Sequence, residues 1–192
     1  LGELTYSVHA EGFWQVHVDA PRVLVERVVR GALGENLERA AGRRVLELYS
    51  GAGLFTLPLA SLVGAGGQVL SLEGNEQAVR DARRTLHDHP AARLASGRVS
   101  ARSVRELAGS FTGGRPDVVV LDPPRQGAGR EVIEAVGALG AERIVLVACD
   151  PAALARDLGT LLRSGYTLGS MSALDMFPHT HHFETIAVLE RS

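Results

Sequence analysis

Three short stretches of this chain carry residues whose types and spacing could do chemistry. The first surrounds the only cysteine, Cys149, which follows an apolar run and precedes Asp150-Pro151, a pattern typical of the turn from a buried strand into a helix. The amino end of a helix favours a thiolate, so Cys149 could be a nucleophile, although the charge of Asp150 would oppose this effect. The alternative is a structural cysteine, because free cysteine is among the most buried residue types.

The second stretch is Glu47-Leu48-Tyr49-Ser50-Gly51-Ala52-Gly53, at the end of a β-rich run. Glycines here let a ligand approach the backbone closely. Thr56 stands where the third glycine of a dinucleotide fingerprint would be, which disfavours NAD and FAD. Glu73 ends the next β-rich run, where a carboxylate can accept hydrogen bonds from both hydroxyls of a ribose. Glu47 and Glu73 therefore favour an adenosine-bearing ligand such as S-adenosylmethionine; the alternative is that both are ordinary strand-end charges.

The third stretch is Leu121-Asp122-Pro123-Pro124-Arg125, which ends another β-rich run. Two prolines prevent a central strand from continuing and hold a rigid loop. Asp122 is thereby left at the sheet edge that also carries Glu47 and Glu73. The alternative is a simple chain reversal, which the placement at this edge disfavours.

The elements that must position these stretches alternate along the chain from residue 44 onward. Continuous apolar runs predict strands buried on both faces at 44–48, 68–73, 117–122 and 143–149. Helical patterns occupy 54–62, 75–87, 129–139 and 151–163, with Asn75 and Asp150 as N-caps and Gly64 and Gly165 as helix stops. This alternation is typical of a doubly wound α/β fold. The segments 166–174 and 183–190 predict a closing strand pair, so we expect a mostly parallel, Rossmann-like sheet with an antiparallel closing strand.

Composition sets the expected organisation. The chain has 192 residues, of which 45% are hydrophobic, so we expect one domain. Its core should comprise residues 42–192. Residues 1–41 should pack on this core as an extended segment at 4–18 and an amphipathic helix at 21–41. One cysteine excludes an intramolecular disulfide, and no apolar run approaches the roughly 20 residues of a membrane span, so we expect a soluble, cytoplasmic protein. The chain lacks an initiator methionine and begins abruptly, so we expect a fragment.

The chain resembles a known family over nearly its whole length. Asp-Pro-Pro-Arg, then Ala-Cys-Asp-Pro followed by Leu154-Ala155-Arg156-Asp157, then Asp-Met-Phe-Pro-His-Thr-His-His-Phe-Glu ending at Glu184, occur in this order. Together they look like the catalytic domain of the RNA uracil-5-methyltransferase family, and Gly12-Phe13-Trp14-Gln15-Val16-His17 resembles the Phe-x-Gln-x-Asn motif of that family. The resemblance implies a class I enzyme that uses S-adenosylmethionine to make 5-methyluridine in tRNA or 23S rRNA. In this family an N-terminal RNA-binding domain and a central domain usually precede this segment.

The resemblance also implies roles for individual residues. Cys149 would add to carbon 6 of uracil and so activate carbon 5, and Glu184 would remove the carbon 5 proton after methyl transfer. The target uridine must be unpaired or flipped out, because a stacked base cannot present carbon 6 to a thiolate. The residues expected near the methyl donor are Gln15, Glu47, Tyr49, Gly51, Gly53, Glu73 and Asp122, and those expected near the substrate base are Asp122, Pro123 and Arg125.

Two departures from the family pattern keep other functions open. The family usually has Ser-Cys-Asn-Pro where this chain has Ala148-Cys149-Asp150-Pro151, and Asn where this chain has His17. The alternatives are an N-methyltransferase that uses Asp-Pro-Pro-Arg to orient a planar nitrogen, and a non-catalytic module that binds RNA or cofactor. The net charge of −2 would leave an RNA substrate to be held partly by surfaces outside this segment. The sequence specifies neither the RNA and its uridine nor the oligomeric state.

The histidines near the carboxyl terminus invite a metal-site interpretation. His181 and His182 would point to opposite sides of an extended segment, and no Cys-x-x-Cys accompanies them or His179, so we expect no metal. These histidines are instead expected to shape the pocket, lie near substrate phosphates or pack against the turn. Phe13 and Trp14 could stack on a base or pack the amino-terminal segment onto the sheet.

Overall fold

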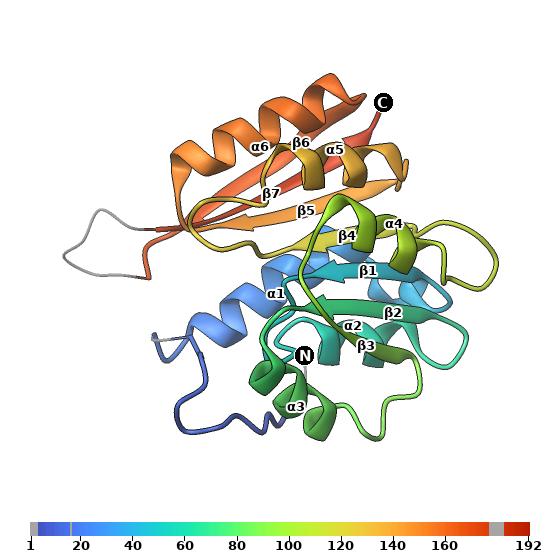
Figure 1. Ribbon diagram of the computed structural model, residues 1–192, viewed down its shortest axis with the longest axis vertical. Coiled ribbons are helices and arrows are strands. Elements are labelled where there is room, and N and C mark those ends of the chain that lie inside the picture. The colour runs from blue at the N-terminus through green and yellow to red at the C-terminus, as the bar shows by residue number, and fades with distance from the viewer. Residues whose placement is uncertain (1–3, 16, 177–182) are drawn as a thin grey trace.

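The computed structural model describes residues 4–15, 17–176 and 183–192 and has one mixed sheet at its centre (Figure 1). The strands are β1 (Arg44–Leu48), β2 (Gln68–Glu73), β3 (Ala92–Ser96), β4 (Val118–Leu121), β5 (Arg143–Ala148), β6 (Tyr166–Leu174) and β7 (Glu184–Arg191). They form a seven-stranded sheet in the order β3-β2-β1-β4-β5-β7-β6. β1 to β5 are parallel, whereas β7 pairs antiparallel with both β5 and β6. The predicted mostly parallel sheet with an antiparallel closing strand is confirmed.

Helices cover both faces of the sheet (Figure 1). One layer contains α1 (Ala20–Leu33), α2 (Thr56–Val63) and α3 (Glu76–Thr85), and the other contains α4 (Ala101–Ala108), α5 (Arg130–Ala138) and α6 (Pro151–Arg163). Alternate strand residues point into different layers, so Val45 packs in the first and Leu46 in the second. Burial on both faces explains the continuous apolar runs in the sequence. Within the described ranges, no helix is long and apolar enough to cross a membrane.

The amino-terminal segment differs from its prediction. α1 ends at Leu33, Gly34 follows with a φ of 87°, and a 3-10 helix, η1 (Leu37–Ala40), comes next. The prediction of one helix over 21–41 was wrong, because the left-handed glycine ends the helix although the apolar pattern continues past it. The described part of 4–18 contains no strand.

Two elements, β3 and α4, were not predicted. β3 is an edge strand with partly exposed side chains, so it lacks the continuous apolar run that identifies a buried strand. α4 buries only Val104 and Ala108. It begins with a capping box in which Ser100 and Ser103 bond each other's backbone, and the second serine replaces the usual Glu or Gln.

The predicted helix boundaries at caps and glycines are confirmed. The Asn75 side chain accepts hydrogen bonds from two backbone N–H groups in the first turn of α3. Asp150 accepts one from the Ala153 N–H at 2.7 Å and so caps α6. Gly64 and Gly165 follow α2 and α6 with φ values of 62° and 87°, which only glycine adopts without strain.

β6 forms one edge of the sheet and, among the described residues, pairs only with β7. Its register shifts by one residue between Leu168 and Ser170, which is a β-bulge at Gly169. Most side chains of β6 are exposed, including that of Met171. The edge strand is therefore both irregular and open to solvent.

An ion pair stabilises the edge of the sheet where β1 and β4 begin. Asp117 accepts hydrogen bonds from Arg44 Nη2 at 2.6 Å and from the Arg44 backbone N–H at 2.8 Å. The Arg44 and Asp117 side chains are only 24% and 16% exposed. Burial alone would raise the pKa of Asp117, but the hydrogen bonds from Arg44 hold it below its ordinary value.

Asp117→Ala is expected to lower the free energy of unfolding by about 2 kcal/mol, because it leaves the Arg44 guanidinium and backbone N–H without their acceptor. Chemical denaturation at pH 7 measures the change. Glu106→Ala is the control, since Glu106 pairs with Arg102 on the exposed surface of α4 and its loss should have little effect. Equal midpoints for the two variants would contradict the structural role of Asp117.

Candidate active site

Five strands carry predicted site residues where they reach one edge of the sheet. The parallel strands β1, β2, β4 and β5 end there, and β7 begins there because it runs in the opposite direction. In doubly wound folds, ligands bind in the crevice beyond this edge. The predicted site residues that lie within or just after these strand ends are Glu47, Tyr49, Gly51, Gly53, Glu73, Asp122, Pro123, Arg125, Cys149 and Glu184.

The loop after β1 has an unusual backbone. Gly51 and Gly53 have φ values of 55° and 89°, and Tyr49 has a φ of 63°. For a bulky residue this left-handed conformation costs on the order of 1 kcal/mol, and such strain is common where a ligand binds. A Cβ on Gly51 would meet no atom within 4 Å, so the backbone there faces open space. Burial raises the pKa of Tyr49 to about 12, which keeps its hydroxyl a hydrogen-bond donor at neutral pH.

Glu73 ends β2 and bonds to the loop after β1. Its Oε2 accepts a hydrogen bond from the Gly51 N–H at 2.8 Å, and its Oε1 accepts one from the Asn75 N–H at 2.7 Å. The side chain is half-buried. The carboxylate is therefore held beside the glycine loop, where doubly wound folds place a carboxylate against a ribose.

Glu47 lies in the core and is only 1% exposed. Its Oε2 accepts hydrogen bonds from the hydroxyls of Thr56 and Ser71 at 2.5 and 2.7 Å, which connects β1 to β2 and to the start of α2. Among the described residues, Glu47 Oε1 has no partner. Burial, only partly opposed by the two hydroxyls, raises the pKa of Glu47 to about 7.

Asp122 adds a second carboxyl group with a raised pKa. It is half-buried directly after β4, and the following Pro123 is buried. Burial, together with repulsion from Glu184, Glu47 and Glu73, raises the pKa of Asp122 to about 7. The four carboxyl groups interact at one edge of the sheet, and this concentration of negative charge favours a cationic ligand.

Cys149 and Glu184 come together through the pairing of β5 with β7. The last pair of the β5–β7 ladder is Ala148 with Thr185, and the next residues toward the edge are Cys149 after β5 and Glu184 at the start of β7. Opposite residues of antiparallel strands have Cβ atoms roughly 5 Å apart, with side chains on the same face. Burial and the charge of Glu184 raise the pKa of the Cys149 thiol, while Arg125 lowers it. Burial also raises the pKa of Glu184, and Arg125 again opposes the rise.

The Asp150 side chain caps the amino end of α6. Its Oδ1 accepts the Ala153 N–H, and Pro151 occupies the first position of the helix. The RNA uracil-5-methyltransferase family, which the sequence resembles, usually has asparagine at this position. An asparagine side chain could accept the same hydrogen bond. The departure at this position therefore preserves the helix cap.

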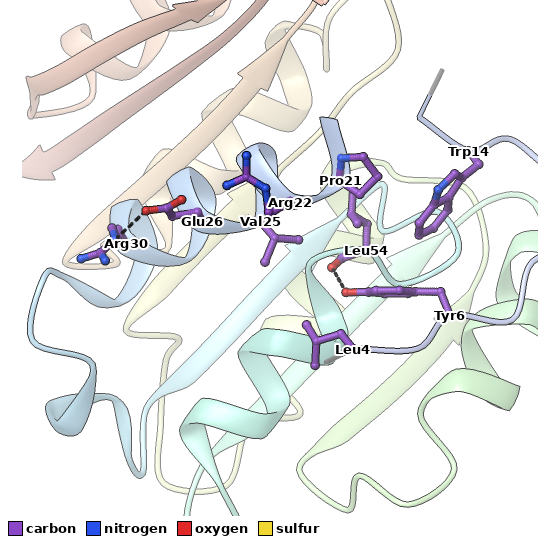
Figure 2. Close-up of a pocket in the computed structure, with 9 residues that line it drawn as sticks. All are labelled: Leu4, Tyr6, Trp14, Pro21, Arg22, Val25, Glu26, Arg30 and Leu54. Carbon is purple, nitrogen blue, oxygen red and sulfur yellow. Dashed lines mark hydrogen bonds and ion pairs between the residues drawn. The ribbon is translucent and has the colours of Figure 1, made fainter. Parts of the chain in front are cut away.

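The amino-terminal segment holds Gln15, which is half-buried. The neighbouring Trp14 packs on Tyr6 with ring centroids 5.1 Å apart, and the Tyr6 hydroxyl donates a hydrogen bond to the Leu54 carbonyl at 2.9 Å. These rings line a groove of about 530 Å³ beside α1 (Figure 2). Trp14 thus packs the segment onto the domain, whereas Phe13 is 77% exposed. The groove is separate from Cys149 and the other strand-end residues, none of which lines it.

The histidines considered for a metal site, His179, His181 and His182, lie outside the described residues. Within residues 4–15, 17–176 and 183–192, no three His, Cys, Asp or Glu side chains converge as metal ligands. Most of the run that ends at Glu184 is likewise undescribed, so its site role rests on Glu184 alone.

Known proteins resemble this chain over nearly its whole length. A family model described as tRNA (Uracil-5-)-methyltransferase matches residues 3–192. The chain belongs to this family. It is 45% identical over 186 residues to an uncharacterized RNA methyltransferase of Streptomyces avermitilis, covering 97% of this chain and 41% of that relative. It is 40% identical over 158 residues to the 23S rRNA (uracil(1939)-C(5))-methyltransferase RlmD of Acinetobacter baumannii, covering 82% of this chain and 34% of that relative.

Solved structures agree with this family and fold. The Pyrococcus abyssi tRNA (uracil-54, C5)-methyltransferase, in complex with S-adenosyl-L-homocysteine, superposes with a TM-score of 0.77 at 30% identity and covers 98% of this chain and 43% of its own. Aeropyrum pernix fibrillarin, with bound S-adenosyl-L-methionine, has a TM-score of 0.67 at 16% identity, covers 88% of this chain and 76% of its own, and supports the fold alone. The resemblance and the class I methyltransferase fold predicted from sequence are confirmed. The chain spans less than half the length of the uracil methyltransferases that it matches.

Sequence reasoning missed the groups that support these side chains. The glycine spacing marks Thr56 only as the place of a missing glycine, yet its hydroxyl and that of Ser71 donate hydrogen bonds to Glu47. Asp157, which bonds the Ala128 N–H after the Asp-Pro-Pro-Arg loop, was part of a recognised motif but had no assigned role. A polar residue at an otherwise buried position was the available signal for Thr56, Ser71 and Asp157.

Without bound ligand, the melting temperature of the protein is expected to fall as pH rises from about 5 to 8. Glu47 and Asp122 have folded-state pKa values of about 7 against ordinary values of 4.5 and 3.8, so in this range the folded state keeps protons that the unfolded state has released. Glu47→Gln removes one such group but keeps an acceptor for Thr56 and Ser71, so it should flatten the pH dependence. Thermal melts at several pH values measure both slopes; identical slopes would count against a buried charge at Glu47.

Asp150→Ala is expected to lower the free energy of unfolding by about 1 kcal/mol, because α6 loses its N-cap. Asp150→Asn should keep most of that stability, since its amide oxygen can accept the same bond from Ala153. Denaturant titration of both variants beside the wild type makes the comparison. If the alanine variant is as stable as the asparagine variant, the cap contributes nothing measurable.

Proposed function

We propose that this chain is the catalytic domain of an enzyme that transfers a methyl group from S-adenosylmethionine to carbon 5 of a uridine in tRNA or ribosomal RNA. The observation that supports the proposal beyond family membership is the β5–β7 register, in which the last pair, Ala148 with Thr185, is followed toward the ligand-binding edge by Cys149 and Glu184. A thiol and a carboxyl group that are neighbours at this edge could act on neighbouring carbons of one planar ring.

The loop after β1 fits the methyl donor. The open space beside Gly51 admits a ligand against the backbone, and the Glu73 carboxylate lies where it could accept the hydroxyls of a ribose. Negative charge from Asp122 and Glu184 would favour a sulfonium cation over the neutral thioether that remains after transfer. S-adenosylmethionine would supply an electrophilic methyl group. The other residues that we assign to donor binding are Gln15, Glu47, Tyr49 and Gly53.

Cys149 would act as the nucleophile toward the base, and Glu184 would act as the general base. The Cys149 thiolate would add to carbon 6 of uracil, forming a carbon–sulfur bond while the electrons of the carbon 5–carbon 6 double bond shift toward carbon 5 and the neighbouring carbonyl. Carbon 5 would then bond to the methyl carbon, and the bond between that carbon and the sulfonium sulfur would break with its electron pair staying on the donor sulfur. Glu184 then removes the proton from carbon 5, and the carbon–sulfur bond breaks with its electron pair returning to sulfur. Asp122, Pro123 and Arg125 would border the base, which must be unpaired or flipped out of its stack.

The charges around Cys149 determine the pKa of its thiol and therefore its reactivity. Burial and Glu184 raise its pKa in this structure, so the thiol is protonated at neutral pH until other charges act on it. Arg125 already opposes the rise, and a cation bound beside the carboxyl groups would lower the thiol pKa further. Binding of the methyl donor would therefore favour the thiolate form of Cys149. This effect would couple donor binding to the attack on carbon 6 of uracil.

The full natural polypeptide that carries this chain, given methyl-labelled S-adenosylmethionine and bulk RNA that lacks 5-methyluridine, is expected to place label in 5-methyluridine. Cys149→Ala should reduce the label to background, because the uracil is no longer activated. Glu184→Gln should accumulate an RNA–protein adduct that survives a denaturing gel, because the carbon 5 proton stays in place. Nucleoside digestion and gel analysis measure these products.

Glu106→Gln, on the exposed surface of α4, is the matched control and should retain full activity. Label in another nucleoside, or label that survives Cys149→Ala, would favour an N-methyltransferase that orients its substrate with Asp-Pro-Pro-Arg. Binding of S-adenosylmethionine without label in any RNA would favour a non-catalytic module.

A further inference from the structure

The loop that carries Arg125 is fastened to α6. Asp157 on α6 accepts a hydrogen bond from the Ala128 N–H at 2.9 Å through its Oδ2. One residue earlier in the helix, Arg156 Nη2 donates to the Gln126 carbonyl at 3.3 Å. Two successive residues of α6 therefore hold the loop backbone on either side of residue 127.

Gly127 packs directly against the Asp157 carboxylate. A Cβ on Gly127 would lie 2.8 Å from Asp157 Oδ2 and 3.3 Å from the Ala153 Cβ, and Gly127 has a φ of 84°. Its N–H also bonds the Pro124 carbonyl at 2.8 Å, which closes a turn around Arg125. The contact with α6 thus leaves no room for a side chain and fixes the path of the backbone.

Asp157 is buried, with only 5% of its surface exposed. Burial raises its pKa, while the Ala128 N–H and Arg156 oppose the rise. Removing the carboxylate would leave the Ala128 N–H without its acceptor in a partly buried position. The hydrogen bond is therefore the main polar attachment between Asp157 and the loop.

The same helix carries the nucleophile at its amino end, since Cys149 directly precedes the Asp150 cap. Arg125 lowers the pKa of both Cys149 and Glu184, whereas Asp122 and Glu184 raise that of Cys149. The electrostatic effect of Arg125 depends on its distance from these groups. The attachment of the loop to α6 therefore determines how strongly Arg125 lowers the pKa values of Cys149 and Glu184.

We propose that Asp157 is a positioning residue for the reaction: its hydrogen bond to the Ala128 N–H holds the loop that carries Arg125 against α6, the helix that begins just after Cys149. This inference rests on the proposed function. Asp157 acts through the loop and does not touch the reacting atoms. Its loss should lower kcat by a larger factor than it changes the KM for S-adenosylmethionine, because most residues assigned to the donor lie at the ends of β1 and β2.

Asp157→Leu and Asp157→Asn in the full natural polypeptide test the proposal. Leucine fills a similar volume but accepts no hydrogen bond, so kcat should fall by about tenfold or more. The rising limb of the kcat/KM profile should move to higher pH, because Glu184 and Asp122 still act on Cys149 while the effect of Arg125 is weakened. Asparagine keeps an acceptor oxygen and should restore kcat to within about threefold of wild type.

Asp117→Asn is the matched control, because Asp117 is also a mostly buried carboxylate that binds a backbone N–H, but at the opposite edge of the sheet. All variants are assayed at a temperature where circular dichroism shows each of them folded. Hydrogen exchange of the Ala128 amide should accelerate in Asp157→Leu and stay slow in Asp117→Asn.

A leucine variant whose kcat and pH profile match those of Asp117→Asn would overturn the proposal and leave Asp157 a purely structural residue. Failure of Asp157→Asn to restore kcat would also overturn it, since the acceptor would then not be what matters. If wild-type protein makes no 5-methyluridine, the proposed function itself fails, and that result is read separately from the comparison between variants.

Discussion

The antiparallel insertion of β7 between β5 and β6 is the constraint on which the site depends. Because β7 enters the sheet at the edge where the parallel strands end, its first residue, Glu184, lies beside the residue that follows β5. A slip of one residue in this pairing would turn Glu184 to the other face of the sheet. Packing opposes such a slip, because Ile186 and Ala187 lie in different helix layers and a slip would exchange a large side chain for a small one in each layer. Packing in the core thus fixes the spacing of groups at the edge.

Negative charge is the second property that shapes the site. Glu47 and Asp122 have pKa values of about 7 because burial and repulsion from neighbouring carboxylates disfavour their ionised forms. The structure accommodates Glu47 by supplying hydroxyl donors from Thr56 and Ser71. A cation bound at this edge would relieve the repulsion, so ligand binding and fold stability are linked.

Local signals made most of the fold predictable from sequence. The bounds of β1 and β2 matched because buried strands leave continuous apolar runs, and those of α6 matched because Asp150-Pro151 starts a helix and Gly165 follows its end. The bounds of β6 matched as well, although most of its side chains are exposed. β3 and α4 left no such signal, as each is partly exposed, and Gly34 divided a helix whose apolar pattern was continuous.

The candidate site was predictable only in part. The strand-end loops followed from the alternation of elements, and family resemblance supplied roles for Cys149 and Glu184. Their juxtaposition depends on strand register, a long-range property that no local pattern encodes. The contact of Asp157 with Ala128 is of the same kind, because it joins residues that only the packing of α6 brings together.

β6 has a consequence for how copies of the protein behave at high concentration. An open edge strand offers a row of unpaired backbone groups on which another chain can form a ladder. The bulge at Gly169 interrupts that row, and the exposed Thr167 and Ser170 add polar groups beside the apolar Leu168 and Met171. A strand of another copy could therefore not form a regular ladder of backbone hydrogen bonds along this edge. The irregular edge disfavours the growth of β-sheet polymers from β6.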